Sequence, residues 1–428
     1  MSKPVSIQQV GVAMRSELTA AALSLLAVSV SVSVSVPASD DYGDLEQFGL
    51  STQEAEAVAS AMRSAREISR RAEEINGKPY RRDAHAKATG CVRGLFEVNG
   101  DIPERFRHSV FASPAQSYEA WVRFSNGDML VQPDRKPDAR GMAIKLMNVS
   151  GERIAPELPD GGTQDFIATN TKAFFNRNIF DYADDMTYLA KFERTRWFVS
   201  FFPPRLHPKQ FYRAIQTVSS KIDNPLQAQY YSMLPYRLGN STVKFSMRAC
   251  PGMQFRDATD KQNADYLSTE LEHSLQTEGA CFDFMVQPQV SGSYMPIDDA
   301  TVVWSEEDSP FEPIARLTLP PQTLGSDEQR EFCENISMNP WHAVGEWEPL
   351  GSLGIARRAV YQAVSRYRHA QNKTVASEPS SWCMKTSLEG GQTVCADKDG
   401  VTTSHPKWPL PREFDSLYRP LSPASTAE

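Results

Sequence analysis

The sequence predicts an α+β protein in which an antiparallel β-barrel carries helical insertions and appended helices. The main observation is a long region, residues 85–320, of short apolar runs separated by Gly, Pro, Asp and Asn, as is typical of antiparallel strands joined by turns. A second observation is helical periodicity on either side of this region. A third is the presence of 29 Pro against 23 Gly in 428 residues, which favours short turns over long helices.

Helical periodicity predicts one helix at 52–74 and another at 355–371. Ser51 or Thr52 can cap the first of these, and Ala55, Val58 and Met62 follow at three- and four-residue spacing. Apolar runs predict strands at 91–98, 120–124, 141–146, 241–247 and 280–287, and the stretch 300–319 ends the β region. Helix-like insertions are expected at 180–197 and 208–222.

These elements predict one main domain at 81–371, preceded by a linker and helix at 39–80 and followed by a loop-rich tail at 372–428. Residues 1–38 are expected to be a signal peptide or a low-complexity segment. Residues 18–36 carry no charge, follow Arg15 and lead into small residues of the kind that a signal peptidase accepts. We therefore expect an exported protein, periplasmic or secreted; an uncleaved membrane anchor and a cytoplasmic protein are the alternatives.

Charge and cysteine content narrow the function classes. The net charge of −8 is poorly suited to neutralising phosphates, so no nucleic-acid partner is expected. The seven His and six Cys form neither a C-x-x-C nor an H-E-x-x-H pattern, which disfavours a zinc site. Cys383 and Cys395 are close enough in sequence to pair in an oxidising compartment. Six unpaired thiols are nevertheless the favoured interpretation.

The predicted helix at 355–371 has a basic stripe beside its apolar face. At about 100° per residue, Arg357, Tyr361 and Arg368 fall close together on this stripe. Buried guanidinium groups need anionic partners, and positive neighbours favour the phenolate form of a tyrosine. A phenolate is a hard ligand suited to ferric iron, and the arginines could pair with carboxylates of a bound cofactor. An amphipathic helix with a basic shoulder remains the simpler alternative.

Four motifs occur in a specific order along the chain. They are Arg82-x-x-His85-Ala86-Lys87, Val122-Arg123-Phe124-Ser125, Phe174-Phe175 and Arg357-x-x-x-Tyr361. Together they resemble the heme catalase superfamily over about residues 80–371. The residues after Gln371 leave little room for the extra domains of large catalases, so the chain is most similar to the small catalase-related heme peroxidases.

The resemblance implies a catalase-like barrel that binds heme b with ferric iron. It implies Tyr361 as the iron ligand, Arg357 as the group that keeps this ligand ionised, and His85, oriented by Ser125, as the catalytic residue on the opposite side. Further residues would hold the cofactor: Arg82, Arg123 and Arg368 at the propionates and Phe174 along the channel.

The chain departs from the family pattern at a distal amide. Without gaps, the position of the family asparagine falls on Thr169, one residue before Asn170. We favour Asn170 for this catalytic role, with Thr169 as the alternative. Gln362, Ala363 and Val364 replace the usual run after the ligand, which bears on dismutation more than on heme binding.

The activity implied is cleavage of the O–O bond of hydrogen peroxide or an organic hydroperoxide, with a reductant as second partner. One alternative is a fatty acid hydroperoxide isomerase or dehydratase of the allene oxide synthase type. That branch has a threonine before the distal histidine, where Ala84 offers no hydroxyl. Another is a non-enzymatic β-barrel binding module. Homo-oligomerisation is left open, and membrane association is expected only if the N-terminal segment stays uncleaved.

Overall fold

The computed structural model describes residues 49–395, apart from 157, 159–160, 377, 385 and 390–391. The predictions for 1–38 and for the end of the tail lie outside the described residues. Among the described residues, no helix combines the length and apolar character needed to cross a membrane.

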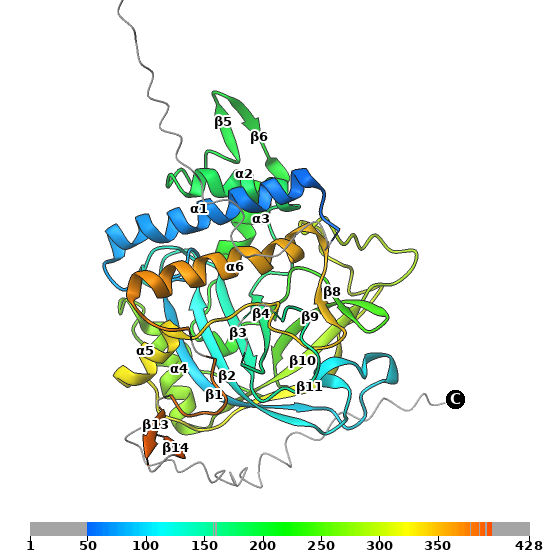
Figure 1. Ribbon diagram of the computed structural model, residues 1–428, viewed down its shortest axis with the longest axis vertical. Helices are drawn as coiled ribbons and strands as arrows, with labels where there is room; N and C mark the ends of the chain where they lie inside the picture. The colour runs from blue at the N-terminus through cyan, green and yellow to red at the C-terminus, as the bar shows by residue number, and fades with distance from the viewer. Residues whose placement is uncertain are drawn as a thin grey trace, which may run out of the picture. The chain divides into compact units, whose positions relative to one another are not determined.

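Within the described residues, eight antiparallel strands form a closed ring in the order β10-β11-β1-β2-β3-β4-β7-β9, and pairing of β9 with β10 closes it. This confirms the α+β barrel that the sequence predicts (Figure 1). The strands are β1 (Ala88–Val98), β2 (Ser117–Asn126), β3 (Arg140–Leu146), β4 (Gln164–Thr169), β7 (Tyr230–Tyr231), β9 (Ser241–Ala249), β10 (Ala280–Pro288) and β11 (Glu312–Leu319). Next to β9, β8 (Tyr236–Leu238) and β12 (Trp347–Pro349) extend the sheet.

Aromatic side chains fill the inside of the barrel. Phe96 of β1 lies 5.4 Å from Phe284 of β10, and Phe166 of β4 lies 5.7 Å from Phe245 of β9, measured between ring centroids. Rings from strands that are not neighbours can meet in this way only across the interior. The interior is therefore a packed core, and a ligand site has to lie elsewhere.

Helices cover one face of this barrel (Figure 1). α1 (Thr52–Asn76) is capped by Ser51, one of the two candidates from the sequence, and the Ser51 hydroxyl and Glu54 form a capping box. α1 packs on α2 (Ile179–Leu189) and on α6 (Gly351–Asn372) through an apolar cluster that includes Val58, Ile179 and Val360. α6 places the predicted basic stripe next to the barrel.

The remaining elements differ more from the sequence-based expectations. The insertion expected at 180–197 is helical only to Leu189 and is followed by a hairpin of β5 (Val199–Phe201) and β6 (Pro204–Leu206). α3 (Pro208–Ser219) occurs as expected, whereas α4 (Tyr266–Thr277) and α5 (Asp327–Asn335) were not predicted. The tail, expected to be loop-like, contains a hairpin of β13 (Thr386–Glu389) and β14 (Gln392–Cys395).

Disulfides correct the expectation of unpaired thiols. Cys91 of β1 bonds to Cys333 of α5, and Cys250 bonds to Cys281. Cys383 is also disulfide-bonded, and no described cysteine is free. The partners of the first bond are 242 residues apart in sequence. Sequence spacing could not reveal this pair, because the barrel topology brings it together.

Removing the Cys91–Cys333 bond should destabilise the protein more than removing Cys250–Cys281. The first bond closes a segment of 242 residues and the second one of 31, and a longer closed loop restricts the unfolded chain more. We expect the Cys91→Ala/Cys333→Ala variant to lose about 2–5 kcal/mol of unfolding free energy in denaturant titrations. A larger loss in the matched Cys250→Ala/Cys281→Ala variant would contradict this ranking.

Candidate functional site

A cavity of about 150 Å³ lies between the outer surface of the barrel and α6. Met142 and Ala143 of β3 and Ile167 and Ala168 of β4 form its apolar wall on the barrel side. Other lining residues come from the segment before β1, β2, α2, the 337–338 segment and α6. His85 and Tyr361, separated by most of the domain in sequence, both line this cavity.

His85 is held on the barrel side of the cavity by an unusual backbone conformation. Its φ is 57°, and its N–H donates to the Gly127 carbonyl at 2.9 Å. The imidazole Nδ1 lies 3.0 Å from Ser125 Oγ on β2. A Cβ on Gly141 would lie 2.5 Å from Nδ1 and 2.9 Å from Ser125 Oγ. Gly141 therefore leaves the space that the ring and its hydroxyl partner occupy.

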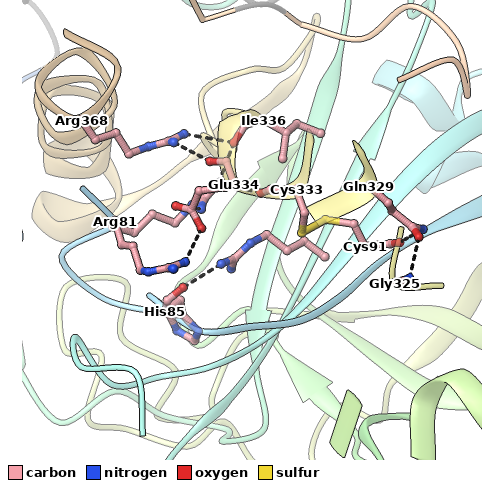
Figure 2. Close-up of a disulfide and its surroundings, with 11 residues drawn as sticks. Arg81, His85, Cys91, Gly325, Gln329, Cys333, Glu334, Ile336 and Arg368 are labelled. Carbon is pink, nitrogen blue, oxygen red and sulfur yellow. Dashed lines mark hydrogen bonds and ion pairs between the residues drawn. A yellow bond between two sulfur atoms is a disulfide. The ribbon is translucent and has the colours of Figure 1, made fainter. Parts of the chain in front are cut away.

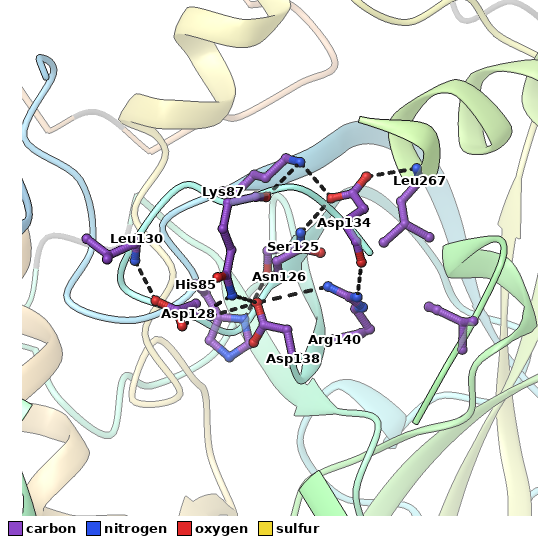
Figure 3. Close-up of polar contacts among 12 residues, drawn as sticks. His85, Lys87, Ser125, Asn126, Asp128, Leu130, Asp134, Asp138, Arg140 and Leu267 are labelled. Atoms are coloured by element: carbon purple, nitrogen blue, oxygen red, sulfur yellow. Dashed lines mark hydrogen bonds and ion pairs between the residues drawn. The ribbon is translucent and has the colours of Figure 1, made fainter. Parts of the chain in front are cut away.

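Asp134 anchors the segment that follows His85 (Figure 3). Its fully buried carboxylate accepts from Lys87 Nζ at 2.6 Å and from Asn126 Nδ2 at 2.7 Å. The carboxylate also accepts from the Leu267 N–H at 2.9 Å, and Arg140 donates to the backbone carbonyl of Asp134. Because a buried carboxylate is costly without partners, these bonds to Asp134 fix the start of β1 against β2 and β3.

Electrostatics keep the His85 imidazole neutral. Burial, together with the guanidinium groups of Arg123, Arg82 and Arg357, lowers the pKa of His85 to about 3. At neutral pH the ring therefore has a lone pair available to accept a proton. Nδ1 contacts Ser125, whereas Nε2 has no hydrogen-bond partner among the described residues.

Tyr361 enters the cavity from α6. Arg357, one helical turn earlier, donates from Nη2 to Tyr361 Oη at 2.7 Å, and its guanidinium lies 4.9 Å from the centre of the tyrosine ring. Arg357 also donates to Tyr236 Oη at 3.2 Å. Burial opposes the charge on Arg357, but the Tyr361 and Tyr236 hydroxyls raise its pKa above the ordinary value. A permanent cation therefore lies against the phenolic oxygen.

Arg82, Arg123 and Arg368 form an arginine cluster along one side of the cavity. Figure 2 shows Arg368 of this cluster directed at Glu334 and Ile336. Arg82 lies 3.4 Å from a Glu334 carboxylate oxygen, while Arg123 donates to the His85 carbonyl at 2.8 Å. Arg368 donates to the carbonyls of Glu334 and Ile336. Glu334 follows Cys333 directly, so the Cys91–Cys333 bond holds this acceptor segment beside the cluster.

Carboxylates among the described residues do not balance the positive charge of the arginine cluster. Among the described residues, neither Arg123 nor Arg368 forms an ion pair, and Arg123 Nε is buried without a partner. Burial lowers the pKa of all members, that of Arg368 to about 9. A bound group with two carboxylates would relieve this cost.

The cavity fits a heme on three counts. The arginine cluster suits two propionates, the walls from β3 and β4 are apolar, and Tyr361 offers a phenolic oxygen backed by a cation. Among the described residues there is no group of three His, Cys, Asp or Glu side chains that would hold a metal ion directly.

Some predicted residues lie away from the cavity. The Asn170 Oδ1 accepts from the Arg140 N–H at 2.8 Å, and its Nδ2 is buried without a partner among the described residues. The Thr169 hydroxyl is directed at Met233 Sδ. Neither residue lines the cavity. Phe174 lies behind the cavity-lining Tyr182, with 6.2 Å between ring centroids.

Sequence reasoning missed Asp83, Gly141 and Tyr182. Burial raises the pKa of Asp83 to about 6, against hydrogen bonds from its own N–H and that of Ala84. Burial also raises the pKa of Tyr182 on α2 well above its usual value. Asp83 lies within the Arg82-x-x-His85 motif, so its acidic side chain was a usable signal. Nothing in the sequence marked Tyr182.

Catalases are among the known proteins that this chain resembles in sequence. The family model for catalase matches residues 73–194. Catalase isozyme 2 of Nicotiana plumbaginifolia is 24% identical over 319 residues, which are 68% of this chain and 61% of that protein. A catalase of Schizosaccharomyces pombe is 22% identical over 262 residues, 56% of this chain and 48% of that protein. The chain thus spans about half to three fifths of the length of the curated relatives that it matches.

Solved structures show the same fold. Catalase A from Saccharomyces cerevisiae superposes with a TM-score of 0.55 at 17% identity, covering 81% of this chain and 76% of that one. A bacterial catalase gives a TM-score of 0.52 at 16% identity, covering 92% and 76%. The chain is thus similar to catalases over part of its sequence and shares their fold.

Proposed function

We propose that the protein is a heme-dependent enzyme that cleaves the O–O bond of a hydroperoxide. The observation that carries this proposal is the placement of the His85–Ser125 and Arg357–Tyr361 pairs around one cavity beside the arginine cluster. Tyr361 would bind the iron, Arg357 would donate a hydrogen bond to the Tyr361 oxygen, and the arginine cluster would hold the propionates. When bound, heme supplies the iron centre at which the O–O bond is broken.

His85 would move the proton that this cleavage requires. A proton on Nδ1 donated to Ser125 Oγ leaves the lone pair on Nε2, and the low pKa keeps that lone pair free at neutral pH. Nε2 would take the proton from one peroxide oxygen and deliver it to the other, so that water or an alcohol leaves. Ser125 and Gly141 act by fixing the ring.

We favour a peroxidase acting with a separate reductant over a catalase. Support for this preference comes from the cavity lining, which includes neither Thr169 nor Asn170, the two candidates for a distal group that would hold a second peroxide. An organic hydroperoxide or hydrogen peroxide would be the oxidising substrate.

We also propose export from the cytoplasm, because bonds such as Cys91–Cys333 and Cys250–Cys281 persist in oxidising compartments.

Incubation of the heme-loaded protein with hydrogen peroxide or a fatty hydroperoxide, with product analysis, tests the reaction class. Rearranged products would favour an isomerase instead.

Tyr361→Phe should lower heme affinity and change the visible spectrum. The substitution removes the oxygen that would bind the iron and leaves Arg357 Nη2 without its acceptor, while Nη1 still donates to Tyr236. Heme titration followed at the Soret band measures the effect, with Tyr182→Phe as the matched control from the same cavity. If Tyr361→Phe and wild type share the same affinity and spectrum, Tyr361 is not the ligand.

His85→Ala should keep heme but lower peroxide turnover by about 10²–10⁴-fold, the usual contribution of a general acid–base. Gly141→Ala should lose an intermediate amount, because its Cβ would lie 2.5 Å from Nδ1 and displace a ring that is still present. Stopped-flow rates at equal heme occupancy measure both. Wild-type rates in His85→Ala would remove this residue from the reaction.

Turnover should show no ionisation of His85 near pH 6.5, because its pKa of about 3 keeps the ring neutral above that value, and protonation of His85 should lower the rate only in stronger acid. Asp83 has a pKa of about 6 and gains its negative charge as the pH rises through this value. An inflection of kcat/KM near pH 6 should therefore disappear in Asp83→Asn. Its persistence would assign the inflection to another group, with His85 the first to test.

A further inference from the structure

α3 is a surface helix whose polar side faces the domain and whose apolar side is exposed. Gln210 and Thr217 are buried, and Gln210 donates to an Asp181 carboxylate oxygen at 3.2 Å. Arg213, also on the inner side, donates to the Thr301 carbonyl at 3.0 Å. The helix is thus attached to the domain through polar groups, and its apolar face points to solvent. That face carries Phe211, Tyr212, Ile215 and Val218.

The β5–β6 hairpin continues this apolar surface. Phe201 is 98% exposed, Phe202 86% and Leu206 71%. The base of the hairpin is tied to the start of α3, because His207 stacks on Trp197 at 4.5 Å and Phe198 contacts Phe211 at 5.5 Å. Figure 1 shows the hairpin projecting from the domain beyond α2. We call Phe201, Phe202, Leu206, Phe211, Tyr212, Ile215 and Val218 the apolar platform.

Basic residues are frequent in the segment that carries the apolar platform. Between residues 191 and 221 the chain has seven Lys or Arg and one Glu, in a protein whose net charge is −8. Four of these cations are in ion pairs, namely Arg194 with Asp128, Arg196 with Glu193, Arg205 with Asp184 and Lys209 with Asp299. Arg213 faces inward, which leaves Lys191 and Lys221 without a carboxylate partner among the described residues. The segment thus combines exposed apolar side chains with two unpaired lysines on an acidic protein.

We propose that the apolar platform docks on the surface of a membrane that contains anionic lipids. Exposed aromatic residues at a hairpin tip, a helix that turns its apolar face outward and flanking cations are the combination that lies in the boundary between headgroups and acyl chains. The cations add attraction to anionic headgroups. The contact is peripheral and does not depend on residues 1–38 or on heme.

A second copy of this chain is the less fitting occupant. Two identical platforms meeting face to face would bring their unpaired cations together, which opposes association. A membrane with negative headgroups satisfies the apolar side chains and the cations at once.

Flotation of the full-length protein with phosphatidylcholine vesicles, with or without phosphatidylglycerol, tests the proposal. We expect binding to the anionic vesicles that weakens as salt is added. Phe201→Ser/Phe202→Ser should reduce the partition coefficient at least about tenfold, because it removes the tip that enters the lipid. Ile75→Ser/Val375→Ser, which changes exposed apolar residues outside the platform, should bind like wild type.

Further readouts separate the possible outcomes. In Phe201→Trp, brominated lipids should quench tryptophan fluorescence more strongly than in wild type. Equal binding by wild type and Phe201→Ser/Phe202→Ser would overturn the proposal, as would the absence of vesicle binding. Sedimentation velocity without lipid provides the last test: a self-associated wild type and a monomeric Phe201→Ser/Phe202→Ser variant would assign the platform to a second copy. Thermal unfolding should be unchanged in each variant, since these side chains are exposed.

Discussion

The hydrogen bond from Arg357 to the Tyr361 hydroxyl is the interaction on which the proposed chemistry depends. It places a permanent cation 2.7 Å from a phenolic oxygen inside a buried cavity. Spacing of four residues on one helix is enough to make this contact, so α6 can carry the whole ligand unit as a rigid element. The barrel then has only to present an opposing wall, and β3 and β4 do so with small and flexible apolar side chains.

On the opposite side of the cavity, a few contacts position His85. His85 sits outside the regular strand, at a φ of 57°, and its ring position is set by Ser125 and by the space over Gly141. The buried Asp134 network fixes the chain next to it, and the Cys91–Cys333 bond fixes the acceptors of the arginine cluster. Polar networks of this kind specify one arrangement, because each unpaired group would be costly.

Much of the scaffold could be predicted from sequence, because its signals are local. Periodicity predicted α1, with Ser51 as one of two candidate caps, and the i, i+4 spacing of Arg357 and Tyr361 predicted their contact. The end of α2 at Leu189 and the cysteine pairs depend on contacts between distant segments, which no local pattern encodes. Asn170 and Phe174 were expected at the cavity from motif spacing alone. In the structure Asn170 Oδ1 accepts from the Arg140 N–H, and Phe174 packs against Tyr182.

Anomalous diffraction at the iron absorption edge, from crystals of the heme-loaded protein, would test the central claim most directly. The account predicts a single strong peak inside the cavity, adjacent to the Tyr361 oxygen and with His85 across from it. A peak bonded to another side chain, or iron bound outside this cavity, would contradict it.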